Sequence, residues 1–399
     1  MGQTRIQYID LGVGIMILWM VVYHALLCAW HIEMDFSSMP ALYQIIPQTT
    51  YTFIDELGEK KIINPCLLFP YLCFFMPFFF YKSGIFHRKV GWKYLLKKDT
   101  RKLLLNYLVW GGIGFIILIF LRLFDCTTTF KGFLFSTIGD IVLYGKAPLN
   151  APLWFLLSLF GVHLIANLLL PGEDFNLKHP HVFHFYCLTI ILIGCALSYF
   201  LYIRAYTDSP IRVSRQPYWI ANITSGFTFY SMGYWVDKYS NKIWLYIPSV
   251  FFYSICCCVG FTIVDMCPNK LLQGNYLLWF PISLVSIITF NALCKLIIVL
   301  REQVSQLLHI KSSIFFFEAI GKNAMTIYVS HFILLKIYSY IARYFHITHV
   351  PHQLIAITLM LLLVISILSY NTLHKKHVSL NKNNQRQAFI LPTEINYNR

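Results

Sequence analysis

Charged residues are scarce in this sequence. Asp, Glu, Lys and Arg together make up only 12% of its 399 residues, whereas hydrophobic residues make up 57%. Water-soluble domains carry about 25% charged residues, so this composition excludes the soluble classes and predicts an integral membrane protein. No polar stretch is long enough for a soluble domain. We therefore expect one membrane domain over residues 1–373 and a polar, poorly ordered cytoplasmic tail over residues 374–399.

The motifs of several large enzyme classes are also missing. The sequence has no phosphate-binding glycine-rich loop, no dinucleotide fingerprint and no serine nucleophile elbow at a strand-to-helix junction. It shows no internal repeat and no matching pair of interrupted helices, which are common in secondary transporters. These absences leave nucleotide-binding and serine-hydrolase chemistry unsupported, and they weaken a transport function.

Acidic residues are few, with 17 Asp and Glu against 32 Lys and Arg, which gives a net charge of +15. Such a charge can indicate nucleic-acid binding, but here the cations gather in the connections on one side of the predicted membrane spans. Cytoplasmic connections normally carry the excess of Lys and Arg. The charge therefore predicts membrane topology, and we expect no nucleic-acid partner.

About ten apolar segments have the length of ~20 residues that a helix needs to cross a bilayer. The distribution of Lys and Arg places both termini in the cytoplasm. The first segment lacks a small-x-small cleavage site, so we expect it to remain a span. The predicted fold is an all-α, polytopic transmembrane helical bundle with spans at about 11–30, 66–86, 103–122, 151–170, 186–203, 221–237, 243–264, 276–299, 323–343 and 353–370.

His24 lies inside the first of these segments. Imidazole exchanges protons near neutral pH, and a polar side chain in a membrane must face protein or a cavity rather than lipid. We therefore expect His24 to take part in chemistry. Asp10 precedes it by about four helical turns and projects to a similar side, so both could line one cavity.

The other histidines and the 11 cysteines give little support for a metal or redox site. Two connections carry three histidines each, but neither has an obvious carboxylate or thiolate partner, so we predict no metal. Most cysteines fall within spans; Cys126 and Cys267 fall in outer connections, where a disulfide is chemically permitted. The histidine groups are His179, His181 and His184, and His346, His349 and His352.

Four short motifs occur in order along most of the chain. They are Tyr8-Ile-Asp10 with Gly14 and His24, the segment Phe75–Gly84, Pro152-Leu-Trp-Phe-Leu156, and the segment Gly321–His331. As a set they resemble the acyltransferase 3 family of membrane acyltransferases.

The resemblance implies an O-acyltransferase that moves an acyl group, commonly acetyl from cytosolic acetyl-CoA, to a hydroxyl of a cell-envelope or capsular polysaccharide. It implies a multi-pass protein of the bacterial plasma (inner) membrane. Acyl-CoA would be a co-substrate rather than a permanently bound cofactor. The expected partners are acyl-CoA, a surface or lipid-linked glycan acceptor and the lipid bilayer.

The resemblance also implies roles for individual residues. His24 is the expected catalytic residue, and the place of His331 in a family-like motif makes it a further catalytic candidate, although a lone buried histidine can also be structural. Asp10 is a third candidate from its own position, where it could orient a cation or cap the start of the helix. Tyr23 and Trp154 are candidates for the wall of the acceptor cavity. His24 could act as a general base on the acceptor hydroxyl or as a nucleophile that forms an acyl-imidazole, and the sequence leaves this open.

One position departs from the family pattern. The family usually has Arg or Lys eleven residues before the histidine, where this sequence has Val13. We expect Lys82, at about the depth of Val13 on the second span, to supply the missing cation, with Ser83 beside it in the donor site. Alternatively, Lys82 extends to the cytoplasmic lipid headgroups.

The densest basic segment, Arg88 to Lys102, is predicted to form a short helix with one cationic stripe. Lys98, Arg101 and Lys102 could hold the phosphates of acyl-CoA through charge-assisted hydrogen bonds. They could equally anchor the segment on anionic lipids. The two roles are compatible.

Two other functions stay open at this level. A transporter or flippase of a glycan or lipid-linked precursor would use His24, Lys295 and Lys336 to line a proton or substrate path. A degenerate family member with a structural role is suggested by Val13.

Overall fold

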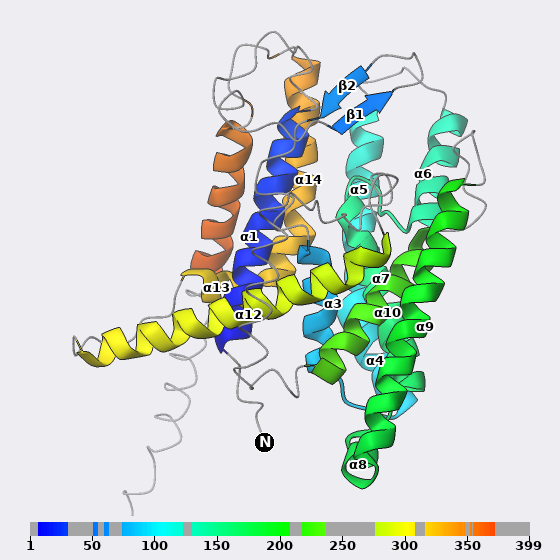
Figure 1. Cartoon of the computed structure of the whole chain (residues 1–399). Coiled ribbons are helices and arrows are strands. Elements are labelled where there is room, and N and C mark those ends of the chain that lie inside the picture. The colour runs from blue at the N-terminus through cyan, green and yellow to red at the C-terminus, as the bar shows by residue number, and fades with distance from the viewer. Residues whose placement is uncertain are drawn as a thin grey trace, which may run out of the picture.

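The computed structural model describes residues 7–30, 51–54, 60–63, 74–122, 130–207, 218–236, 276–307, 316–345, 347, 352 and 354–371. Within these ranges the chain forms helices, apart from one short antiparallel hairpin in which Tyr51 pairs with Ile63 and Ile54 with Lys60. The hairpin lies at the top of the molecule in Figure 1.

The helices of the first half are α1 (Gln7–Trp30), α3 (Phe75–Ile85), α4 (Trp92–Asp99), the π-helical turn η3 (Thr100–Leu104), α5 (Leu105–Arg122), α6 (Phe130–Tyr144), the 3-10 turn η4 (Ala151–Leu153) and α7 (Trp154–Leu169). Those of the second half are α8 (Glu173–Lys178), α9 (Pro180–Thr207), α10 (Tyr218–Val236), α12 (Tyr276–Leu307), α13 (Phe316–Lys322), α14 (Ala324–Tyr344) and an unlabelled last helix, Leu354–Asn371. The strands are β1 (Tyr51–Ile54) and β2 (Lys60–Ile63).

Seven of the described helices are long and apolar enough to cross a membrane. They coincide with seven of the predicted spans, so the polytopic helical class is confirmed, while the count of about ten and the side of each terminus stay predictions. The seven are Gln7–Ala25, Trp92–Leu121, Ala151–Leu169, Pro180–Leu201, Ser283–Gln303, Ala324–Ala342 and Leu354–Asn371.

Several predictions lie partly or wholly outside the described residues. These are the start of the second span, the seventh span at 243–264, the tail at 374–399, the pair Cys126 and Cys267, and two of the histidines, His346 and His349.

Two connections differ from the prediction. The stretch between the predicted third and fourth spans contains α6, for which the sequence predicts no element because the helix is too short to span a bilayer. The basic segment does form the predicted short helix, α4, but it runs through η3 into α5, so the apolar span continues a helix that begins at Trp92.

The predicted sixth span is helical as α10, but it is not among the helices apolar enough to qualify as a span on composition. It packs against α3, α7 and α9, and Asn222, Ser225, Thr228 and Ser231 are all buried in it. A helix surrounded by protein needs no lipid-facing surface, and small polar residues let neighbouring helices approach. Its low hydropathy therefore reflects a central position in the bundle.

Glycines allow two helix pairs to touch backbone to backbone. A Cβ on Gly14 of α1 would lie 1.7 Å from the carbonyl oxygen of Phe317, and one on Gly321 would lie 1.9 Å from the carbonyl oxygen of Asp10. Gly84 of α3 and Gly233 of α10 form a second reciprocal contact of the same kind. Close approach through small residues is a main source of helix association in membranes. It brings α13, and the start of α14 after it, directly against α1.

Helix α12 crosses in front of α1 at a steep angle (Figure 1). Its later part is tied to two neighbours, because Arg301 donates to Glu318 of α13 at 2.5 Å and to Gln7 of α1 at 2.9 Å. The side chains of Arg301 and Glu318 are only 10% and 3% exposed. The pair thus joins three helices at a point where water cannot replace it.

Glu318→Gln should destabilise the protein by about 2–4 kcal/mol, because it leaves the Arg301 guanidinium buried without its carboxylate. We would measure thermal unfolding of the purified protein in detergent. Glu302→Gln changes the same chemical group on an exposed neighbour of Arg301 and should leave the unfolding temperature unchanged. Equal unfolding temperatures for the two variants would contradict the prediction.

Candidate active site

Two histidines from distant parts of the chain meet between α1 and α14, which lie side by side in Figure 1. Nδ1 of His24 lies 3.0 Å from Nε2 of His331, and the two rings stack with centroids 5.1 Å apart. His331 is fully buried, whereas His24 is half-buried. The more accessible ring of the pair is therefore His24.

The surroundings of His331 fix which nitrogen of each ring carries hydrogen. Nδ1 of His331 lies 2.8 Å from the carbonyl oxygen of Tyr328 and 3.2 Å from that of Ile327. A carbonyl oxygen only accepts, so Nδ1 of His331 donates and, in the neutral ring, Nε2 carries the lone pair. His24 then donates from Nδ1 to that lone pair. The remaining nitrogen of neutral His24, Nε2, is left as a base.

Aromatic side chains hold the His24 ring from two sides. The ring of Phe332 meets it edge-on at 5.2 Å, and the ring of Tyr23 is tilted against it at 5.5 Å. Nζ of Lys336 lies 5.4 Å from the centroid of the Phe332 ring, on the face that cations prefer. The predicted wall residue Tyr23 is therefore at the site, and Lys336 lies one ring away from His24.

The turn between α6 and α7 is hydrogen-bonded to α14 next to His331. Asn150 is fully buried and donates from Nδ2 to the carbonyl oxygen of Val329 at 2.8 Å, and the hydroxyl of Tyr328 donates to the carbonyl oxygen of Pro152. The turn has two residues with positive φ, Gly145 at 65° and Leu149 at 55°. A non-glycine residue in that region is strained and persists only where its surroundings hold it.

A pocket of about 280 Å³ opens beside this arrangement. We call it the lysine pocket, because Lys82, Ser83 and Lys322 supply its polar lining. Its other lining residues are Val13, Ile17, Met76, Phe79, Phe155, Leu156, Leu159, Gly321, Ala324, Met325 and Tyr328. The lysine pocket thus combines two cations with a largely apolar interior.

The lysine pocket and His24 share one side of α1. Val13 and Ile17 line the pocket, and His24 follows Ile17 by seven residues, which is about two turns or ~10 Å along the helix. Tyr328 connects the two places from the other side, because its ring lines the pocket while its carbonyl oxygen accepts from His331. The lysine pocket and His24 thus lie about two helical turns apart on the same side of α1.

The predicted donor residues separate into two groups. Lys82 and Ser83 lie with Val13 on the lysine pocket, as the depth argument predicted. Three others are exposed on α4 and η3 and do not line it, namely Lys98, Arg101 and Lys102.

Asp10 and Trp154 are not in contact with the histidine pair. Asp10 is buried where α1 meets α13, about 21 Å below His24 along the helix axis. Trp154 is half-buried, packs edge-on against Phe155 and lies over the turn at Gly145. Both stay candidates whose position favours an indirect role.

Within the described residues, no group of three His, Cys, Asp or Glu side chains is placed to hold a metal ion. His184 accepts from Nε1 of Trp235 at 3.1 Å, and His352 lies between the Tyr338 hydroxyl and the carbonyl oxygen of Ile347, each at 2.7 Å. These contacts give both histidines structural roles.

The model of the acyltransferase 3 family, which describes an acyltransferase domain, matches residues 6–370 of the chain. The chain belongs to the acyltransferase 3 family. The match covers nearly the whole sequence and confirms the family resemblance carried by the four motifs. The protein is accordingly a membrane acyltransferase. No protein of curated function and no solved structure matches it.

The sequence reading of this acyltransferase 3 protein missed two residues near the site. Lys322 lines the lysine pocket and stands inside the motif Gly321–His331, so a search of that motif for cations would have found it. Asn150 lies two residues before Pro152, where the motif begins, but nothing in its sequence context indicates that it reaches Val329.

Proposed function

We propose that the protein transfers an acyl group from cytosolic acyl-CoA to a hydroxyl of a cell-envelope or capsular polysaccharide at the plasma membrane, and that this acyl group is acetyl. The observation that carries the proposal is the His24–His331 pair, which supplies an oriented base about two helical turns along α1 from the lysine pocket, a cavity whose apolar lining and two cations suit an acyl donor. Family membership supports acyl transfer as the reaction class.

The proposed reaction uses Nε2 of His24. The acceptor hydroxyl gives its proton to Nε2, its oxygen attacks the thioester carbonyl, and the carbon–sulfur bond breaks as the new ester forms. The leaving thiolate then takes the proton from the His24 imidazolium. His331 holds the ring throughout, because its own Nδ1–H stays on the carbonyl oxygens of Tyr328 and Ile327.

A covalent variant of the same chemistry is also open, in which Nε2 attacks the thioester and carries the acyl group to the acceptor. Brief exposure of purified protein to acetyl-CoA labelled in the acetyl group distinguishes the two. Label that stays on the protein and is absent from His24→Gln indicates the acyl-imidazole. No label on the purified protein, together with labelled glycan in isolated membranes, indicates direct transfer.

The reaction and the acceptor are tested together by mass spectrometry of the surface glycan from cells with and without this protein. We expect a mass difference of one acetyl group per modified sugar. An unchanged glycan, with no consumption of acetyl-CoA by isolated membranes, would contradict the proposal and favour a degenerate family member.

In this proposal Lys82 and Lys322 hold the negative charges of the donor in place of the arginine or lysine that Val13 replaces. Lys82→Ala and Lys322→Ala should each raise KM for acetyl-CoA by about 10-fold, since a hydrogen bond to a charged group contributes ~1.5–3 kcal/mol. The measurement is initial rate against acetyl-CoA concentration.

Lys178→Ala removes an exposed lysine from α8 and serves as the matched control, with no expected change in KM. Wild-type KM in both pocket variants would assign the two lysines to lipid headgroups instead.

Transport has less support. Lys295 lies 4.7 Å from the ring of Tyr8 near the start of α1, whereas Lys336 lies beside Phe332 near His24, at the other end of that helix. The two lysines and His24 are thus spread along the helix, and family membership favours acyl transfer.

A further inference from the structure

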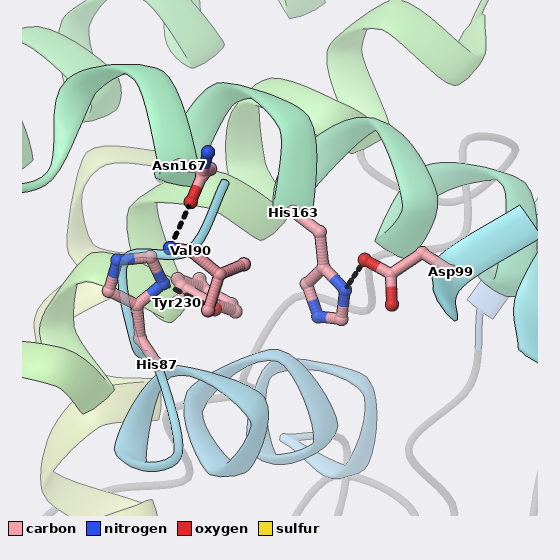
Figure 2. A network of polar contacts seen from close by, with 6 residues as sticks. All are labelled: His87, Val90, Asp99, His163, Asn167 and Tyr230. Atoms are coloured by element: carbon pink, nitrogen blue, oxygen red, sulfur yellow. Dashed lines mark hydrogen bonds and ion pairs between the residues drawn. The ribbon is translucent and has the colours of Figure 1, made fainter. Parts of the chain in front are cut away.

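A second buried polar network lies at the end of the bundle that carries α4 and α8 (Figure 1). Figure 2 shows that its side chains come from α4, α7, α10 and the segment after α3. Nδ1 of His163 on α7 donates to Oδ2 of Asp99 at 2.8 Å, and Asp99 is only 2% exposed. The Tyr230 ring packs on His163 at 5.6 Å, and its hydroxyl lies 2.9 Å from Nδ1 of His87.

Asp99 occupies a position where the helix pattern calls for an apolar residue. Along α4 and η3, only Leu95, Asp99 and Leu103 are buried, at a spacing of four residues that places them on one inward stripe. The rest of this segment is exposed, including Trp92, Tyr94 and Leu96. Burying a carboxylate costs free energy unless a charged or hydrogen-bonding partner compensates it. His163 provides that partner.

The helix changes its winding directly after Asp99. Residues Thr100–Leu104 form a π-helical turn between α4 and α5. Such turns are rare and are frequent at functional sites, because the extra residue rotates the side chains that follow. Two of the three predicted phosphate-binding cations, Arg101 and Lys102, lie in this turn, and Lys98 immediately precedes Asp99. The Asp99–His163 contact therefore fixes the helix at the point that orients all three cations.

The network also connects this segment to the walls of the lysine pocket. His163 follows the lining residue Leu159 by four residues on α7, and His87 follows the lining residue Ser83 by four residues after α3. One helical turn is ~5.4 Å, so His163 lies about one turn beyond the pocket, and His87 lies just after the end of α3. Asn167, one turn further on α7, accepts from the backbone N–H of Val90 at 3.0 Å, just before α4 begins.

We propose that Asp99 and His163 are positioning residues for the acyl donor. They dock α4 and η3 on the bundle so that Lys98, Arg101 and Lys102 face the 3′-phosphate of acyl-CoA, while its diphosphate and thioester arm occupy the lysine pocket. This inference rests on the proposed function. Asp99 and His163 themselves touch no substrate; their effect passes through the three cations.

The test compares two donors that share the thioester but differ in phosphate content. Asp99→Asn should raise KM for acetyl-CoA by about 10-fold, leave kcat within twofold of wild type, and leave KM for S-acetyl-pantetheine, which has no phosphate, unchanged. Asp174→Asn, an exposed acid on α8 at the same end of the bundle, is the matched control and should behave as wild type.

A pair of variants at His163 covers the case in which Asp99→Asn does not fold. His163→Gln keeps a side-chain N–H that can donate to Asp99 and should retain a KM for acetyl-CoA near that of wild type, whereas His163→Phe should raise it as Asp99→Asn does. Thermal unfolding in detergent shows which variants are folded.

An equal change in KM for both donors, or an unchanged KM for acetyl-CoA, would overturn the proposal. The second result would assign the three cations to anionic lipid. Calorimetric titration of the purified protein with CoA separates this proposal from the proposed function. If wild type binds CoA and folded Asp99→Asn binds about 10-fold more weakly, the positioning role holds even where no acyl transfer is found. If folded Asp99→Asn binds CoA as wild type does, the role is wrong.

Discussion

His24→Gln should lower the rate of acyl transfer by about 10² to 10⁴ at saturating acetyl-CoA, which is the contribution of a well-positioned general base or nucleophile. Glutamine has a similar size and can still meet Nε2 of His331, so the packing of α1 against α14 should persist. It has no nitrogen that takes up a proton near neutral pH. The loss should therefore appear in kcat, with little change in KM for acetyl-CoA.

The control for this prediction is His352→Gln, which replaces another buried histidine with its own hydrogen bonds to Tyr338 and Ile347. It should retain wild-type kcat. The assay follows labelled acetyl from acetyl-CoA into the glycan fraction of isolated membranes. A His24→Gln protein that keeps more than a tenth of wild-type kcat would show that His24 is not the base, and the proposed reaction would fail.

Gly14→Val should prevent recovery of folded protein, or lower the free energy of unfolding by more than ~3 kcal/mol. The first atom of the new side chain would lie 1.7 Å from the carbonyl oxygen of Phe317, well inside contact distance. Overpacking usually costs ~1–3 kcal/mol because flexible side chains move aside. Here the obstacle is backbone, and Gly321 on α13 makes the reciprocal contact, so neither helix can yield without separating.

Gly112→Val is the matched control for this substitution. Gly112 lies on a membrane helix, α5, is exposed, and a Cβ there meets nothing within 4 Å. It should unfold at the same temperature as wild type in detergent. Separation of α1 from α13 would also displace α14, so any folded Gly14→Val protein should have lost acyl transfer together with stability. Wild-type stability and activity in Gly14→Val would refute this account of the contact.

The spans could be predicted because hydropathy acts on each segment separately. Ser283–Gln303 and Leu354–Asn371 present many exposed apolar side chains, and both were found from composition. α10 shows the limit of this approach, since its polar residues are buried by α3, α7 and α9. The sequence of α10 alone does not indicate which helices will surround it. α6 was missed for the related reason that it is too short to give a span signal.

The residues of the candidate site also divide into those that the sequence predicts and those whose position depends on helix packing. His24 was predicted to be a functional residue because a histidine in an apolar segment is costly wherever the segment packs. Lys82 was placed near Val13 by counting depth along two spans, and both line the lysine pocket. The position of a residue along its span predicts its depth in the membrane, but it does not predict the direction in which the side chain projects from the helix. It therefore predicted neither that Lys322 would join them nor that Lys98 would not line the pocket.

The sequence by itself determined the membrane class and the acyltransferase 3 family, and it made His24 the first catalytic candidate, because these depend on local composition and on motifs that keep their order along the chain. Only the tertiary structure decided that His331, 307 residues away, fixes the hydrogen position on His24, and that Asp99 meets His163 across two helices. Both pairings require two side chains to meet within ~3 Å, and that distance is set by how the helices pack, through contacts such as Gly14 against Phe317.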